Sequence, residues 1–252
     1  MFERQNVLIT GGSKGLGSAL SMELARRGAR VVVVARNGRA VAKTVEHIRA
    51  TGGEAHGIEG DLGSAEDATR IAIEAAARVG PIDVLIHNAS TLGPTPLRPL
   101  ADLEPEEVAR VFEVNVLGPF RLSRAVIGSM ILRGHGLIVG ISSDAAIEAY
   151  PGWGPYGASK AGLDHLLKIW AAELGERGVR VVMFDPGEMA TDMHRAAIPD
   201  ADPASLEDPA HVASTIVRVL EEGRAHGIRI RVPTLLHTAH KTDEQAHEDV
   251  RS

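Results

Sequence analysis

The feature that most constrains the fold is a regular alternation of short β-branched runs with longer segments of helical periodicity. The runs predicted to be buried strands are residues 7–9, 31–34, 84–86, 137–139, 179–184 and 228–232, and residues 55–59 form a less apolar candidate. Strands that are apolar almost throughout are typical of a parallel sheet covered by helices on both faces. The pattern therefore predicts an α/β protein with a parallel sheet of about seven strands.

Helical patterns fill the intervals between these strands, at residues 16–27, 39–50, 65–79, 104–131, 156–177 and 208–222. Ser64 is placed to cap one of these helices, and Pro209 follows Asp208 at the first position of the last one. Repeated strand–helix units joined by right-handed crossovers give a doubly wound Rossmann fold. No linker or composition break interrupts the pattern, so we predict one domain over residues 1–240 and a polar tail over 241–252.

Composition excludes several classes of function. The formal charge of −6, from 27 basic and 33 acidic residues, indicates no general affinity for nucleic acid. The lack of cysteine excludes disulfides, thiolate nucleophiles and iron–sulfur ligation, and favours a cytoplasmic location. We find no signal-peptide pattern at the N-terminus, and no apolar run approaches the ~20 residues that a membrane span requires. His237 and His240 are the closest histidine pair, but no further ligand is placed beside them, so we expect no metal site.

The turn after the first predicted strand is rich in glycine. It runs Thr10-Gly11-Gly12-Ser13-Lys14-Gly15-Leu16-Gly17 and leads directly into a helix. Glycines at such a turn let the backbone approach a pyrophosphate, whose charge is met by free N–H groups at the helix N-terminus. The strict dinucleotide spacing is not met, because Leu20 stands where the third glycine would fall, and the Walker pattern also fails. The turn indicates a dinucleotide site, and a tight turn that binds nothing is the alternative.

A second candidate group is a tyrosine and a lysine four residues apart, Tyr156 and Lys160. On a helix these positions share one face, so a phenol and an ammonium can address one site. Tyrosine is a poor acid–base catalyst at neutral pH because its ordinary pKa is about 10, and a nearby cation lowers that pKa. The pair alone is suggestive of proton transfer, with coincidence as the alternative.

Together with further motifs, these residues resemble the classical short-chain dehydrogenase/reductases over residues 5–232. The glycine turn has that family's own spacing. Asp61-Leu62 resembles the family's adenine contact, residues 87–90 resemble the motif after its fourth strand, and Pro186-Gly187 with Thr191 resembles the segment that binds the nicotinamide carboxamide. The resemblance implies that the cofactor is bound by Gly11, Ser13, Lys14, Gly15, Leu16, Gly17, Arg36, Asp61, Leu62, Asn88, Ala89, Tyr156, Lys160, Pro186, Gly187 and Thr191.

The same resemblance implies a catalytic tetrad of Asn115, Ser143, Tyr156 and Lys160. Ser143 stands 13 residues before Tyr156 (156 − 143), which is the family's spacing. In this scheme Tyr156 is the general acid for a carbonyl oxygen, and the base in reverse, while Ser143 polarises that oxygen. Lys160 binds the nicotinamide ribose and lowers the Tyr156 pKa, and Asn115 retains a water molecule. The alternatives are a strand-end cap for Ser143, a solvated Lys160 and a structural Asn115 in a kinked helix.

Some positions depart from the family pattern. His87 and Ser90 stand where the family has asparagine and glycine, on either side of Asn88 and Ala89. Residues 231–234 stand where many relatives carry an Asp-Gly-Gly ending. The changes at His87 and Ser90 could alter the backbone beside the cofactor. The change at residues 231–234 puts the family's usual tetramer contact in doubt.

The choice of dinucleotide is predicted from the end of the second strand. Folds of this type that are specific for NAD place an acidic residue there, about 20 residues beyond the glycine turn. Here Ala35 occupies that position and Arg36 follows it, with Lys14 as a second cation. Because a guanidinium can pair with a 2′-phosphate, we predict NADP(H), against the alternative that both cations are solvated surface charges.

The predicted function is an oxidoreductase that interconverts a secondary alcohol and a carbonyl with NADP(H). An imine or enone reductase and a non-catalytic NADP(H)-sensing regulatory protein are the alternatives. Substrate contacts are expected from residues 92–97 and 188–209, whereas Tyr150 and Trp153 either line the cleft or pack their own loop. The helix from Tyr156 is apolar on several sides, so we predict a homodimer or homotetramer.

Overall fold

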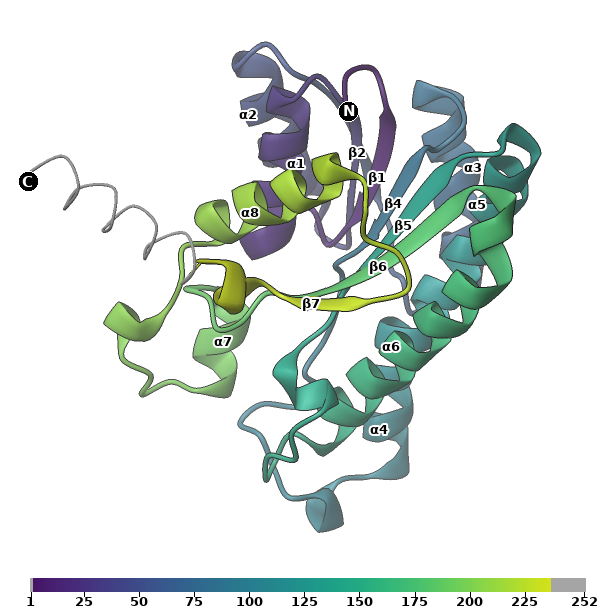
Figure 1. Ribbon diagram of the computed structural model, residues 1–252. Coiled ribbons are helices and arrows are strands. Elements are labelled where there is room, and N and C mark those ends of the chain that lie inside the picture. The colour runs from purple at the N-terminus through teal and green to yellow at the C-terminus, as the bar shows by residue number, and fades with distance from the viewer. Residues whose placement is uncertain (1, 237–252) are drawn as a thin grey trace, which may run out of the picture.

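Seven parallel strands form the central sheet of the computed structural model, which describes residues 2–236 (Figure 1). In chain order they are β1 (Asn6–Thr10), β2 (Arg30–Ala35), β3 (Glu54–Glu59), β4 (Val84–His87), β5 (Gly136–Ile141), β6 (Val179–Asp185) and β7 (Arg229–Arg231). Their spatial order is β3-β2-β1-β4-β5-β6-β7, and every neighbouring pair is parallel. The chain winds outward from β1 in one direction and from β4 in the other, which confirms the predicted doubly wound Rossmann fold.

Helices cover both faces of this sheet, as Figure 1 shows. One layer consists of α1 (Gly15–Arg26), α2 (Gly38–Ala50) and α8 (Pro209–Glu222), and the opposite layer of α3 (Ala65–Val79), α5 (Gly118–Arg133) and α6 (Gly154–Leu174). Side chains of one strand alternate between the layers: Val7 and Ile9 pack with the first, and Leu8 packs with the second. Burial of each such side chain contributes about 1.5–3 kcal/mol, so the two apolar layers hold the strand ends in place.

The predicted helix starts at Ser64 and Asp208 are confirmed. The Ser64 hydroxyl accepts from the Asp67 N–H at 3.3 Å, and the Asp208 carboxylate accepts from the Ala210 N–H at 2.9 Å. Pro209 is the first residue of α8. An N–H at this position would have no partner within the helix, so its absence in proline costs no hydrogen bond.

The helix predicted as one element over 104–131 is two helices in the structure. They are α4 (Pro105–Phe112) and α5, joined by a π-helical turn at Glu113–Leu117. Within this turn the Gly118 N–H donates to the Glu113 carbonyl oxygen, one residue beyond the α-helical spacing. Pro119 explains the interruption, because it has no N–H to offer the Asn115 carbonyl oxygen one turn earlier. The widened turn is where the predicted site residue Asn115 lies.

A short helix, α7 (Asp192–Ala197), lies within the segment 188–209, for which the sequence predicts loop structure. Thr191 caps it by accepting from the His194 N–H at 3.2 Å. Across residues 2–236, no helix is both long and apolar enough to cross a membrane, and no three His, Asp or Glu side chains are grouped to hold a metal ion. His237, His240 and the predicted tail over 241–252 lie outside the described residues.

Candidate active site

The carboxyl ends of the strands border a cleft of about 1670 Å³. It lies where the strand order reverses between β1 and β4, the place at which open α/β sheets bind ligands. Of the predicted site residues, all within the described range, only Asn115 does not line the cleft. The others that line it are Gly11, Ser13, Lys14, Gly15, Leu16, Gly17, Arg36, Asp61, Leu62, Asn88, Ala89, Ser143, Tyr156, Lys160, Pro186, Gly187 and Thr191.

The glycine turn after β1 leaves space for a ligand beside the start of α1. Gly15 has a φ of +47°, in the left-handed region that glycine favours. A side chain at Gly17 would collide with the Gly11 carbonyl oxygen and the Asn88 amide. That amide donates to the carbonyl oxygens of Thr10 and Gly11, at 3.1 Å each, and ties the turn to the end of β4. Because no side chain caps α1, its first N–H groups are free, which fits the pyrophosphate of a dinucleotide.

The end of β2 presents a cation and no carboxylate of its own. Ala35 lines the cleft, and the exposed Arg36 has no hydrogen bond or ion pair to any residue in the described part of the chain. Two charged residues that the sequence analysis missed also line this region: Arg39 in the first turn of α2 and Glu59 at the end of β3. A side chain at Gly38 would collide with the Glu59 carboxylate, so this acid lies against the start of α2. Its proximity follows from the pairing of β3 with β2.

Two further predicted cofactor contacts are paired with neighbouring charges. Lys14 Nζ lies 3.8 Å from an Asp192 carboxylate oxygen, and both side chains are 70% exposed. Such an exposed pair contributes at most about 1 kcal/mol, so Lys14 can exchange it for a phosphate. Burial alone would raise the pKa of Asp61, but hydrogen bonds from the Gly63 N–H and from Arg110 hold that pKa below its ordinary value.

Ser143, Tyr156 and Lys160 line one part of the cleft. Tyr156 is in the first turn of α6 and Lys160 one turn later, and both side chains are buried. Lys160 Nζ lies 5.5 Å from the centre of the Tyr156 ring and donates to the Ile141 carbonyl oxygen at 2.7 Å. Ser143 follows β5, and its hydroxyl donates to Asp144 Oδ1 at 3.0 Å. The structure therefore brings the predicted phenol, ammonium and hydroxyl to one site.

Burial sets the protonation of the two residues on α6. It raises the pKa of Tyr156 to about 12, although the neighbouring hydroxyls of Ser143 and Ser90 act to lower it. It lowers the pKa of Lys160 to about 8, against the opposing effect of the Asp164 charge. The expected fall of the Tyr156 pKa below its ordinary value is not found, because desolvation of the phenolate dominates, and the Lys160 ammonium donates to a backbone carbonyl. At neutral pH Tyr156 is a protonated phenol beside a cation.

Asn115 is tied to this site through hydrogen bonds. Its side chain is buried in the π-helical turn, where Oδ1 accepts from the Thr91 N–H at 2.8 Å. Its Nδ2 donates to the Thr91 carbonyl oxygen and to the Ser159 hydroxyl, both at 2.9 Å. Since Ser159 lies between Tyr156 and Lys160 in α6, Asn115 fastens the turn to the helix that carries both.

The departures at His87 and Ser90 each have a structural consequence. His87 is buried, with Nε2 2.7 Å from the Ser123 hydroxyl oxygen. Burial, assisted by the Lys160 charge, lowers the pKa of His87 to about 3, so its ring is neutral. Ser90 lines the cleft and presents a hydroxyl to Tyr156 where the family has a glycine.

Aromatic and acidic side chains line the cleft beside Tyr156. The Trp153 ring meets the Tyr156 ring edge-on, with 5.6 Å between centres, and the Tyr150 hydroxyl donates to Asp144 Oδ2 at 2.9 Å. Tyr150 and Trp153 both line the cleft and also pack edge-on against each other, with 6.5 Å between ring centres, so both alternatives left by the sequence hold. Asp144 is a lining residue that the sequence analysis missed, although its position directly after Ser143 is a signal for it. The same cleft is lined by Met189, Met193 and His194.

Comparisons with known proteins agree with this arrangement. The family model for short chain dehydrogenases matches residues 5–202. The 7alpha-hydroxysteroid dehydrogenase of Escherichia coli is 34% identical over 192 residues, which cover 76% of this chain and 73% of that protein. A short chain dehydrogenase of Shigella flexneri complexed with NADP superposes with a TM-score of 0.85 at 27% identity, covering 92% of this chain and 98% of the other.

A second solved structure is a 7alpha-hydroxysteroid dehydrogenase complexed with NADH and 7-oxo glycochenodeoxycholic acid. Its TM-score is 0.84 at 28% identity, and the match covers 91% of this chain and 93% of that one. Related structures thus hold either dinucleotide. The family match spans most of the chain, and the fold places the motifs around one cleft, so this chain belongs to the short chain dehydrogenase family of oxidoreductases.

Proposed function

We propose that the protein is an NADP(H)-dependent oxidoreductase that interconverts a secondary alcohol and a carbonyl compound. The observation that carries the proposal is the meeting of Ser143, Tyr156 and Lys160 in the cleft that the glycine turn also lines. A proton donor beside a dinucleotide-type turn is what carbonyl reduction requires.

The residues of this chain supply the proton and the polar contacts. A nicotinamide cofactor, when bound, supplies a hydride to the carbonyl carbon in reduction and accepts it in oxidation. Tyr156 donates its phenolic proton to the carbonyl oxygen, which completes the alcohol, and its raised pKa keeps that proton in place at neutral pH. Ser143 turns its O–H from Asp144 to the same oxygen and stabilises the charge that develops there. Lys160 offsets the charge of the phenolate that Tyr156 becomes.

The proposed positioning of this group involves two further residues. Asn115, through Ser159, holds the first two turns of α6, and its role in retaining a water molecule stays a prediction. Trp153 packs on the Tyr156 ring and provides an apolar wall for the substrate.

The direct test is turnover of a panel of ketones and aldehydes, including steroid ketones, by the purified full chain with NADPH or NADH, followed by cofactor absorbance. We expect reduction of at least one carbonyl. Turnover of imines or enones alone would favour the alternative reductase, and tight NADPH binding without any turnover would favour the sensing protein. Either result would overturn the proposal.

The preference for NADP(H) rests on the end of β2. Arg36 is exposed and its charge acts on the nearby Asp61 carboxylate, but it has no hydrogen bond or ion pair within the described residues, and Arg39 lies in the adjacent first turn of α2. Both can pair with a 2′-phosphate. Glu59 acts in the opposite direction, because its carboxylate lies against the start of α2 and can accept from ribose hydroxyls instead. We propose that the two guanidinium groups outweigh this one carboxylate.

Changing Ala35 to Asp and Arg36 to Gln together is expected to lower the ratio of kcat/KM for NADPH to that for NADH by about 10²-fold, since a charge-assisted contact is lost and a repulsion is added. The change should appear mainly in KM. Lys43→Gln, on the exposed side of α2 and outside the cleft, is the matched control and should leave the ratio unchanged. A native protein that uses NADH as well as or better than NADPH would contradict the assignment.

The proposed homodimer rests on the outer face of α5 and α6. Phe120 and Trp170 stack there with 5.5 Å between ring centres, and Ile169 is 47% exposed. A second copy that packs its own α5 and α6 on this face would cover these apolar side chains.

We expect light scattering of the native chain at micromolar concentration to give at least the mass of a dimer. Ile169→Asp should shift the mass toward the monomer because it places a charge in the proposed interface. Ile73→Asp is the matched control, since Ile73 is a 65% exposed isoleucine on α3. A monomeric mass for the native chain, or equal effects of the two substitutions, would contradict this interface.

A further inference from the structure

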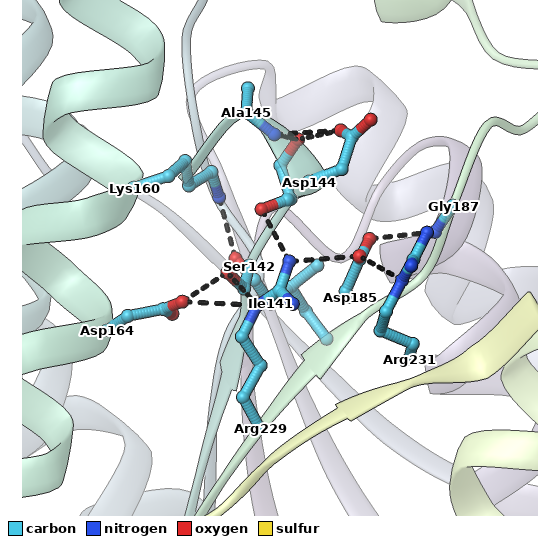
Figure 2. Close-up of polar contacts among 11 residues, drawn as sticks. Ile141, Ser142, Asp144, Ala145, Lys160, Asp164, Asp185, Gly187, Arg229 and Arg231 are labelled. Carbon is cyan, nitrogen blue, oxygen red and sulfur yellow. Dashed lines mark hydrogen bonds and ion pairs between the residues drawn. The ribbon is translucent and has the colours of Figure 1, made fainter. Parts of the chain in front are cut away.

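An arginine of the edge strand β7, largely removed from solvent, contacts the segment that carries Ser143. Arg229 is the first residue of β7, and its side chain is 10% exposed. Figure 2 shows it extending between Asp164 of α6 and Asp185 of β6. Arg229 does not line the cleft, and the family resemblance assigns it no role.

On one side, Arg229 holds the segment that carries Ser143. Its Nη2 donates to the Ser143 carbonyl oxygen at 2.8 Å, and its Nε lies 3.3 Å from the Ser142 hydroxyl oxygen. The same Nε is 3.3 Å from Asp164 Oδ2, which accepts from the Ser142 hydroxyl at 2.7 Å (Figure 2). The Ser143 backbone is thereby fixed to α6, one turn after Lys160.

On the other side, Arg229 holds the segment that carries Pro186 and Gly187. Its Nη2 donates to Asp185 Oδ2 at 2.9 Å, and Asp185 Oδ1 accepts from the Gly187 N–H at 3.1 Å. Asp185 is 2% exposed, so this carboxylate depends on its partners within the protein. One guanidinium therefore connects the turn after β5 with the turn after β6.

We propose that Arg229 is a positioning residue for the reaction, which sets the distance between the Ser143 hydroxyl and the Gly187 segment of the cofactor site. This inference rests on the proposed function, since both segments border the place where the carbonyl is reduced. The planar fork of arginine suits the task, because Nε and Nη2 bond in fixed directions to groups on three elements. A lysine ammonium has one nitrogen and cannot hold both segments in the same way.

The test compares Arg229→Lys with Arg231→Gln. Arg231 is the matched control: it is on the same strand and its Nε lies 3.5 Å from the same Asp185 oxygen, but it is 63% exposed and has no contact with Ser143. In the full chain, Arg229→Lys should lower kcat by about 10–100-fold, as a small misplacement of reacting groups does. The primary deuterium isotope effect on kcat, with deuterated NADPH, should rise as the chemical step becomes limiting. The control should change neither quantity.

Hydrogen exchange gives a readout that does not depend on activity. With NADPH bound, Arg229→Lys should exchange faster than the control in both segments, 142–146 and 185–190, while α1 and α2 exchange as in the native chain. If the native chain reduces no carbonyl, the proposed function is wrong. Faster exchange in both segments would still show that Arg229 holds them in position, and unchanged exchange would show that it does not.

If Arg229→Lys does not fold, Asp185→Asn serves as the second variant. It keeps an acceptor for the Gly187 N–H but removes the carboxylate oxygen that Arg229 Nη2 contacts. It should raise the isotope effect and speed exchange over 185–190. Native-like kcat, isotope effect and exchange in the variant that folds would overturn the proposal, as would a loss of kcat explained entirely by fewer NADPH-binding sites per chain.

Discussion

Replacing Tyr156 with phenylalanine is expected to lower kcat for carbonyl reduction by about 10²–10⁴-fold, the usual contribution of a positioned proton donor. The ring would still pack against Trp153, so only the buried hydroxyl is lost. NADPH affinity should be nearly unchanged, because the glycine turn and α1 are untouched. Steady-state kinetics together with the quenching of protein fluorescence by NADPH would separate the two effects.

Tyr150 provides the matched control for this experiment, because it is the other tyrosine of the chain and lines the same cleft. Its hydroxyl bonds to Asp144 and not to the proposed reaction site. Tyr150→Phe should therefore retain kcat within a small factor, with any change appearing in the substrate KM. If Tyr156→Phe kept the native kcat, Tyr156 would not be the proton donor.

Most of the fold could be predicted from the sequence because the strands are short apolar runs and the long helices show helical periodicity, whereas the short helix α7 was not predicted. Even the less apolar segment at residues 55–59 falls within β3. A kink at Asn115 was foreseen only as an alternative, and the division of residues 104–131 into α4 and α5 was not predicted, because one proline in an otherwise helical pattern does not reveal that a π-helical turn precedes it. Pro119 is the visible signal in the sequence. It leaves the Asn115 carbonyl oxygen without its α-helical hydrogen bond, and hydrophobic periodicity carries no information about backbone hydrogen bonds.

The cleft could be predicted residue by residue where motifs are local. The glycine turn, the Tyr156–Lys160 pair and Pro186–Gly187 are each contiguous or one helical turn apart, so the resemblance carries them directly to the cleft. The contacts that were missed join distant parts of the chain. Glu59 reaches the start of α2 only because β3 pairs with β2, and Arg229 contacts Ser143 across 86 residues of sequence.

The protonation of Tyr156 shows a further limit of sequence reasoning. Spacing places the ammonium of Lys160 on the same face as the phenol, which predicts a lowered Tyr156 pKa. The spacing does not report that both groups are buried or that the ammonium donates to the Ile141 carbonyl oxygen. Desolvation acts on each side chain separately, so the pKa of the phenol rises while the pKa of the amine falls.

Replacing Lys160 with methionine is expected to lower kcat by about 10²–10⁴-fold in both reaction directions, because the phenolate form of Tyr156 would lose its neighbouring cation. The methionine fills a similar volume, so α6 should keep its packing, which thermal unfolding would verify. The KM for NADPH should also rise, since Lys160 lines the cofactor cleft. Lys168→Met, at an exposed position of the same helix, is the matched control and should retain native kinetics.

The kcat/KM of the native chain for reduction is expected to depend on pH through the charge of Lys160. Burial lowers the pKa of Lys160 to about 8, so its positive charge is present below that pH and is lost as the pH rises through it. Tyr156 keeps its proton until about pH 12 and therefore does not limit reduction in this range. Reduction by the native chain should decline above about pH 8, tenfold per pH unit in kcat/KM. Lys160→Met should show low activity without that decline. A native profile flat up to pH 10, or the same decline in both proteins, would contradict the role of the Lys160 ammonium.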